Sequence, residues 1–132
     1  MATRSKKWHL IYCDREIRSC PVTDFIDTCR PKHQAKILRF LGLLEEMGPI
    51  LPRPYADLLV DGIHELRIKL SGDQIRLLYF FCYQKYIVLY YGFVKNTSRV
   101  PEKFIRKVVD YREDFLNRVE PSQLEMMIDA PV

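Results

Sequence analysis

The sequence lacks the features that mark exported, membrane-spanning or metal-binding proteins. Its 132 residues contain no apolar run near the roughly 18 residues that a membrane span requires. The charged N-terminal stretch has no apolar segment typical of a signal peptide. The four cysteines form no C-x-x-C pair, and the three histidines show no metal-ligand spacing. We therefore expect a cytoplasmic protein with free thiols and no metal site.

Acidic residues are scarce relative to basic ones in most of the chain. The net charge is +4, but the last 14 residues contain Glu120, Glu125 and Asp129 and no Lys or Arg, so the remainder carries +7. A basic body favours a polyanion or an acidic partner protein, although the same charge also suits an ordinary solvated surface. We predict one domain over residues 1–118 and an acidic tail over residues 119–132. The alternatives for the tail are disorder, packing on the body, docking to a partner, and covering the basic face.

Apolar periodicity predicts a small α+β domain. Strands are expected over residues 7–13, 64–71, 74–83 and 86–94, and helices over residues 22–29, 32–47 and from Ser98 to the end of the domain. Pro31 separates the first two helices, and Gly48 ends the second. The Pro-rich residues 49–62 are expected to form a surface connector. Short turns predict antiparallel neighbours, so we expect helices on one face of a small antiparallel sheet.

Three cations lie within the first predicted hairpin. Strand alternation places Arg67 and Lys69 on the face opposite the apolar side chains, which must meet the helices. If residues 72–73 form a two-residue turn, Lys69 lies opposite Arg76 on the open face. A three-residue loop would turn Arg76 into the core. We prefer the first register, because an unpaired buried arginine is very costly.

The same reasoning applies to the second hairpin. If residues 84–85 form the turn, Tyr83 pairs with Tyr86, and Arg76 lies opposite Phe93.

The open sheet face is then expected to carry four cations with aromatic rings between them. This set comprises Arg67, Lys69, Arg76 and Lys95 with Tyr91 and Phe93. Such a surface suits single-stranded RNA, because cations bind phosphates and rings stack on bases. The alternative is a solvated face whose cations pair with Glu65 or with a neighbouring helix.

Three motifs in this region resemble a known family when taken in order. They are Gly62 with Glu65-Leu66-Arg67, then Arg76-Leu77-Leu78-Tyr79-Phe80, then Gly92-Phe93-Val94-Lys95-Asn96-Thr97 with Pro101. Their order and spacing resemble the RelE/HigB superfamily of toxins from bacterial type II toxin–antitoxin pairs, in particular the phage-derived Gp49-like branch. The resemblance covers roughly residues 6 to 117.

The resemblance implies a microbial-RNase-like sheet with helices on one side. It also implies an endoribonuclease that cuts mRNA, usually in the ribosomal A site, without a metal or organic cofactor. A cognate antitoxin, often a helix-turn-helix DNA-binding protein in this branch, would hold the toxin inactive.

The resemblance also implies the catalytic residues. The basic catalytic positions fall on Arg67, Lys69, Arg76 and Lys95. The stretch Asp110-Tyr111-Arg112 is the nearest match to a C-terminal D-Y-H stretch of HigB-type relatives, which makes Tyr111 a catalytic candidate, with a core tyrosine as the alternative. Tyr91, Phe93 and Arg99 are the expected RNA-binding residues.

Two other classes of function remain open at this point. The related ParE branch has a similar fold and poisons DNA gyrase, but it lacks the full basic set. The other possibility is a non-catalytic phage module that binds RNA or an acidic protein.

Overall fold

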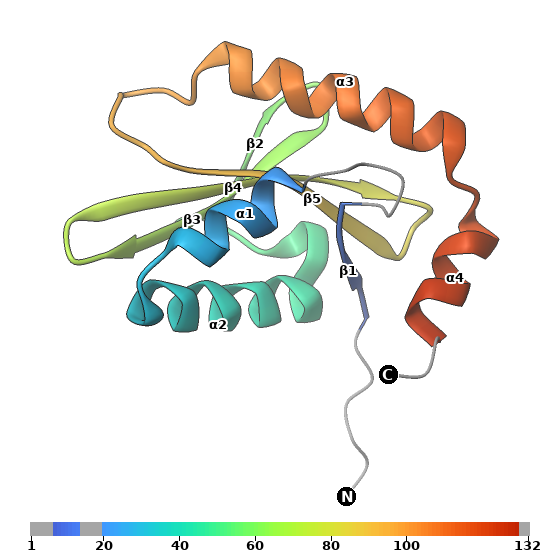
Figure 1. The fold of residues 1–132 in the computed structure, drawn as a ribbon, viewed down its shortest axis with the longest axis horizontal. Helices are drawn as coiled ribbons and strands as arrows, with labels where there is room; N and C mark the ends of the chain where they lie inside the picture. The colour runs from blue at the N-terminus through green and yellow to red at the C-terminus, as the bar shows by residue number, and fades with distance from the viewer. Residues whose placement is uncertain (1–6, 14–19, 130–132) are drawn as a thin grey trace, which may run out of the picture.

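A five-stranded sheet, with strand order β1-β5-β4-β3-β2, lies between two layers of helices (Figure 1). The computed structural model describes residues 7–13 and 20–129. The elements are β1 (His9–Tyr12), α1 (Pro21–Thr28), α2 (Pro31–Met47), the 3-10 helix η1 (Gly48–Ile50), β2 (Ala56–Val60), β3 (Ile63–Leu70), β4 (Asp73–Cys82), β5 (Tyr86–Val94), α3 (Glu102–Arg118) and α4 (Pro121–Asp129). The predicted α+β class is confirmed. None of the helices in residues 20–129 combines the length and the apolar composition that a membrane span requires.

Helices cover both faces of the sheet. Val22 of α1 and Ile37 of α2 belong to one buried cluster together with Leu66 of β3. Val108 of α3 belongs to a second cluster together with Phe80 of β4. Figure 1 shows α3 on one side of the sheet and α1 and α2 on the other. The prediction that all helices share one face is therefore wrong, because the apolar stripe of α3 packs on the face that we expected to be open.

The sheet is mixed and includes a strand that the sequence did not reveal. β1 pairs parallel with β5, whereas the other pairs are antiparallel. β2 lies in the region expected to be a connector, and it pairs with β3. The prolines of that region all precede Ala56, so they leave the N–H groups of β2 intact.

The β3–β4 turn consists of Ser71 and Gly72, which both have positive φ, as a two-residue hairpin turn of type I′ requires. The register pairs Arg67 with Arg76, so the predicted pairing of Lys69 with Arg76 is wrong by two residues. Because strand side chains alternate with a period of two, this shift leaves each side chain on its predicted face.

The β4–β5 hairpin has a longer loop than we predicted. Tyr83 does not pair with Tyr86, because Cys82 occupies that position. An irregularity farther along the ladder compensates for the change, and the predicted pairing of Arg76 with Phe93 is confirmed.

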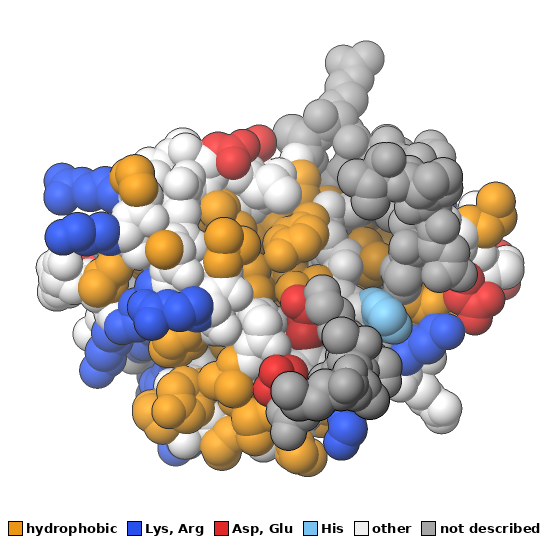
Figure 2. Space-filling model, turned by 90° about the horizontal axis from the view of Figure 1, so that it is seen from below, with side chains coloured by type: hydrophobic (Ala, Val, Ile, Leu, Met, Phe, Trp, Pro, Cys, Tyr) orange, Lys and Arg blue, Asp and Glu red, His pale blue; other side chains and the backbone are white. Residues whose placement is uncertain are grey.

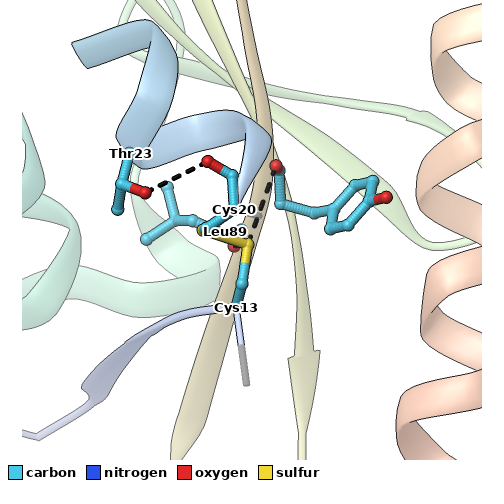
Figure 3. The surroundings of a disulfide bond; sticks show 5 residues. Cys13, Cys20, Thr23 and Leu89 are labelled. Atoms are coloured by element: carbon cyan, nitrogen blue, oxygen red, sulfur yellow. Dashed lines mark hydrogen bonds between the residues drawn. A yellow bond between two sulfur atoms is a disulfide. The ribbon is translucent and has the colours of Figure 1, made fainter. Parts of the chain in front are cut away.

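A disulfide joins Cys13, after β1, to Cys20, before α1 (Figure 3). The expectation of free thiols is therefore wrong for this pair, whereas Cys29 and Cys82 are free. The hydroxyl of Thr23 donates to the carbonyl of Cys20 over 3.1 Å and holds this end of the bridge. The spacing of Cys13 and Cys20 matches no metal or redox motif, so only the path of the chain from β1 to α1 brings their Cα atoms to within 5.7 Å.

The predicted acidic tail contains α4, which packs on the body. Leu124 is buried in the cluster beneath α3. The hydroxyl of Tyr83 donates to the carbonyl of Val119 over 2.7 Å, and Lys85 pairs with Glu125 at 3.2 Å. Of the alternatives for the tail, the structure shows packing on the body, beside the β4–β5 loop (Figure 1).

Candidate functional site

The four predicted basic catalytic residues line one pocket of about 370 Å³. Arg67 and Arg76 occupy paired positions of β3 and β4, and Lys69 lies two residues farther along β3. Lys95 follows the end of β5, and its backbone N–H donates to the carbonyl of Gln74 over 2.6 Å. The sheet therefore brings positive charge from three chain segments to one place.

The carboxylate of Glu65 lies between the two arginines. Its Oε1 atom is 3.0 Å from Nε of Arg67 and 3.7 Å from Nε of Arg76. Glu65 and Arg76 are each only 2% exposed, so little water screens their attraction. We considered Glu65 only as a partner of the cations in the alternative interpretation, and the structure shows that pairing. The place of Glu65 in the Glu-Leu-Arg motif was the signal that could have identified it.

Arg76 is fixed in the wall of the pocket. Its Nη1 donates to the carbonyl of Ile75 over 3.1 Å, and its Nη2 donates to Oε1 of Gln74 over 3.0 Å. Burial lowers the pKa of Arg76, and the negative charge of Glu65 opposes this change. We expected Arg76 on an open face. The structure instead buries it in the pocket wall, with Glu65 as the opposite charge that makes burial tolerable.

α2 and the segment before β2 complete the pocket with Lys36, Phe40, Pro54 and Tyr55. The ammonium group of Lys36 donates to the carbonyl of Lys69 and lies 5.7 Å from the centroid of the Phe40 ring. Phe40 and Tyr55 meet edge to face, with ring centroids 5.7 Å apart. The sequence contained no signal for these residues, because only the packing of α2 and of the segment before β2 against β3 brings them to the cations.

A second pocket of about 420 Å³ shares part of this wall. Arg67 and Lys95 line both pockets, so they stand where the two pockets meet. The predicted RNA-binding residue Arg99 lines the second pocket, together with Asp57 of β2 and Ile105 of α3. Arg99 is exposed and therefore accessible to a ligand.

The predicted RNA-binding rings Tyr91 and Phe93 pack under α3. The ring centroid of Phe104 lies 4.9 Å from that of Tyr91 and 4.8 Å from that of Phe93. The ammonium group of Lys107 lies 5.3 Å from the centroid of the Tyr91 ring. Tyr91 and Phe93 are absent from the described walls of both pockets, so these rings belong to the interface between the sheet and α3.

Tyr111 lies on the buried side of α3, in the core between this helix and the sheet. Its ring stacks on Tyr90 with centroids 4.2 Å apart, and it also contacts Phe115. Tyr111 is not among the described residues that line the two pockets. Tyr111 is therefore a core tyrosine, as in our alternative interpretation. It does not line the pocket that contains the four cations.

Basic side chains gather at one end of the molecule. In Figure 2, Lys and Arg side chains concentrate at the left, the end where the β3–β4 turn lies in Figure 1. α4 lies at the other end of β4, so the hypothesis that the acidic tail covers the basic residues is wrong for its described part. Among the described side chains, no group of three or more His, Cys, Asp or Glu could hold a metal ion.

Comparison with known families identifies the family of this chain. The model of the family described as phage derived protein Gp49-like (DUF891) matches residues 24–112, which is more than half of the chain and includes Glu65 and the four pocket cations. The chain belongs to this family, which is of the RelE/HigB toxin type and implies an antitoxin partner. No curated protein matches the chain.

Proposed function

We propose that this protein is the toxin of a type II toxin–antitoxin system and an endoribonuclease that cleaves mRNA on the ribosome without a metal ion. The observation that carries the proposal is the convergence of Arg67, Lys69, Arg76 and Lys95 on one pocket. Fixed cations in a partly enclosed site stabilise the charge that develops on phosphoryl oxygens. Membership of a toxin family supports the biological role and the expectation of an antitoxin.

The proposed reaction is attack by a ribose 2′-hydroxyl on the adjacent phosphorus. The 2′-O–P bond forms while the P–O5′ bond breaks, which leaves a 2′,3′-cyclic phosphate and a free 5′-hydroxyl. The 2′-hydroxyl loses a proton to a base, and the leaving 5′-oxygen receives a proton from an acid. Two groups that transfer protons and one that binds the phosphate are therefore sufficient.

The burial of the cations suggests how these roles are divided. The side chain of Arg67 is 30% exposed, so it can bind phosphate oxygens, whereas Arg76 adds fixed positive charge from the wall. The exposed Lys69, in its neutral amine form, is our candidate for the group that accepts the 2′ proton and becomes an ammonium group, and the half-buried Lys95 is our candidate for the proton donor.

Mapping of cleavage sites on a translated mRNA tests the proposal. Wild-type protein is compared with Arg67→Ala and Arg76→Ala, each with and without ribosomes. Arg67→Ala is included because removal of the buried Arg76 takes away one of the two guanidinium groups that pair with Glu65 and can disturb folding. Lys85→Ala is the matched control, since Lys85 is a cation at the far end of β4 that pairs with Glu125.

We expect cuts only during translation, with 2′,3′-cyclic phosphate ends, and their loss in both arginine variants. Cuts on RNA without ribosomes would support the nuclease activity and contradict its dependence on the ribosome. If the folded wild-type protein made no cuts and left translation unharmed, the nuclease proposal would be overturned, and gyrase inhibition or simple binding would be tested next.

A further inference from the structure

We propose that Tyr55, supported by Phe40 and Lys36, forms a subsite that binds one base of a single-stranded RNA beside the pocket cations. This inference rests on the proposed function, because it names how the same site holds its substrate. It assigns the stacking role to residues other than Tyr91 and Phe93, whose rings are covered by α3.

Tyr55 offers an accessible ring in the wall of the basic pocket. It is 38% exposed, although it lines the pocket together with Arg67 and Lys95. Exposed aromatic rings next to cations are what single-stranded nucleic acids require, because every base has a face that can stack. The pocket volume of about 370 Å³ lies in the usual range for small-ligand sites.

Backbone hydrogen bonds fix the main chain of Tyr55 beside that of Arg67, the proposed phosphate-binding residue. The N–H of Arg67 donates to the carbonyl of Tyr55 over 2.8 Å, and the N–H of Tyr55 donates to the carbonyl of Pro52 over 3.0 Å. Pro54 precedes Tyr55 and restricts the chain further. A base on Tyr55 would therefore lie beside the phosphate held by Arg67, as neighbouring parts of one nucleotide chain do.

α2 supports this ring from the other side of the pocket. Phe40 contacts the Tyr55 ring edge to face, which limits its rotation. Lys36 lies against Phe40 and donates to the carbonyl of Lys69, so its charge stays in the pocket. The subsite thus combines one ring for a base with a cation for a flanking phosphate.

The test uses the full-length protein and a fully 2′-O-methylated single-stranded RNA, which cannot undergo 2′-hydroxyl attack. A second strand of equal length has the same backbone but no bases. Fluorescence anisotropy gives the Kd of wild type, Tyr55→Ala and Tyr55→Phe for both strands. Tyr12→Ala is the matched control, because Tyr12 on β1 is also 38% exposed and is not among the residues that line the pocket.

We expect Tyr55→Ala to weaken binding of the base-bearing strand by about 5- to 150-fold and to leave binding of the abasic strand unchanged. Tyr55→Phe and Tyr12→Ala should both bind as wild type does. Equal weakening on both strands, an unchanged Kd, or no RNA binding by wild type would each overturn the inference. Because this strand cannot be cleaved, the binding measurement does not depend on nuclease activity. A failure of the nuclease proposal and a failure of this inference can therefore be told apart.

Discussion

Arg67 and Arg76 lie directly opposite each other across the β3–β4 pair, although both carry positive charge. Like charges at such positions destabilise a sheet unless another group compensates. The Oε1 atom of Glu65 approaches Nε of both side chains, so one carboxylate allows two guanidinium groups to remain in the pocket wall.

Replacing Glu65 by Gln should therefore destabilise the protein strongly. Gln keeps the shape but removes the charge, which leaves a buried Arg76 without its counter-charge. We expect a loss of about 3–5 kcal/mol in the free energy of unfolding, measured by urea denaturation. The control Asp57→Asn breaks the more exposed pair with Arg53 and should cost less than about 1 kcal/mol. A Glu65→Gln variant as stable as wild type would contradict this account of the pair.

Lys95→Ala should lower the rate of cleavage by about 10²- to 10⁴-fold, if Lys95 protonates the leaving 5′-oxygen. A substrate with sulfur in place of that oxygen needs no such proton, because a thiolate is a good leaving group. Wild type and Lys95→Ala should therefore cleave the sulfur substrate at similar rates, as measured by single-turnover kinetics. A loss of equal size on both substrates would assign Lys95 to phosphate binding instead.

His64 should make the stability depend on pH. Its ring stacks on Tyr79, and burial lowers its pKa below the ordinary value of 6.5, with a smaller opposing effect from Asp57. The unfolded chain therefore binds the proton first, so stability is highest above about pH 6.5 and falls as the pH decreases through the folded pKa.

Urea denaturation at pH 7.5 and pH 5.5 measures this dependence. The decrease in stability should be smaller in His64→Phe, which keeps an aromatic ring against Tyr79. His9→Gln retains His64 and should behave as wild type does. An undiminished decrease in His64→Phe would show that other groups cause the effect.

The disulfide between Cys13 and Cys20 should stabilise the fold. The two cysteines are seven residues apart, and closing a loop of this size removes unfolded-state entropy worth about 2–3 kcal/mol. Cys20→Ser and treatment of wild type with dithiothreitol should cause similar losses in urea denaturation, and the two should not add. Cys29→Ser, a change at a free cysteine, should not reproduce the loss. No effect of dithiothreitol would mean that the bridge does not form in solution.

Leu124 should anchor α4 for stability and not for activity. It is 0% exposed, whereas Met126 on the same helix is 74% exposed. Leu124→Ala should cost about 2–5 kcal/mol of unfolding free energy, and Met126→Ala much less. The RNA affinity of both variants should equal that of wild type, because α4 lies at the end of β4 away from the pocket. A higher affinity in folded Leu124→Ala would revive the idea that the tail regulates the basic residues.

The faces of the central strands could be predicted without knowledge of their register. The shift of Lys69 to a position opposite Gln74 changed the neighbours of each cation but not its face, because a shift of two residues preserves alternation. The bounds of α2 were equally predictable, since Pro31 is tolerated at a helix start and Gly48 adopts positive φ at its end.

The burial of the site could not be predicted in the same way. An amphipathic stripe shows that α3 packs on a sheet, but it does not say which face of the sheet it covers. Once α3 covers the second face, Tyr91 and Phe93 become part of the core, and Arg76 needs a buried partner.

The sequence by itself determined which strands carry the cations and on which side they project, because both depend on local alternation and on turn residues. The sequence left open whether Glu65 pairs with the cations, and the tertiary structure decided that it joins Arg67 to Arg76 and that Tyr55 lies beside them. The reason is physical. Side-chain pairing, burial and pocket walls arise from contacts between segments far apart in the chain, and no local pattern encodes which segments will meet.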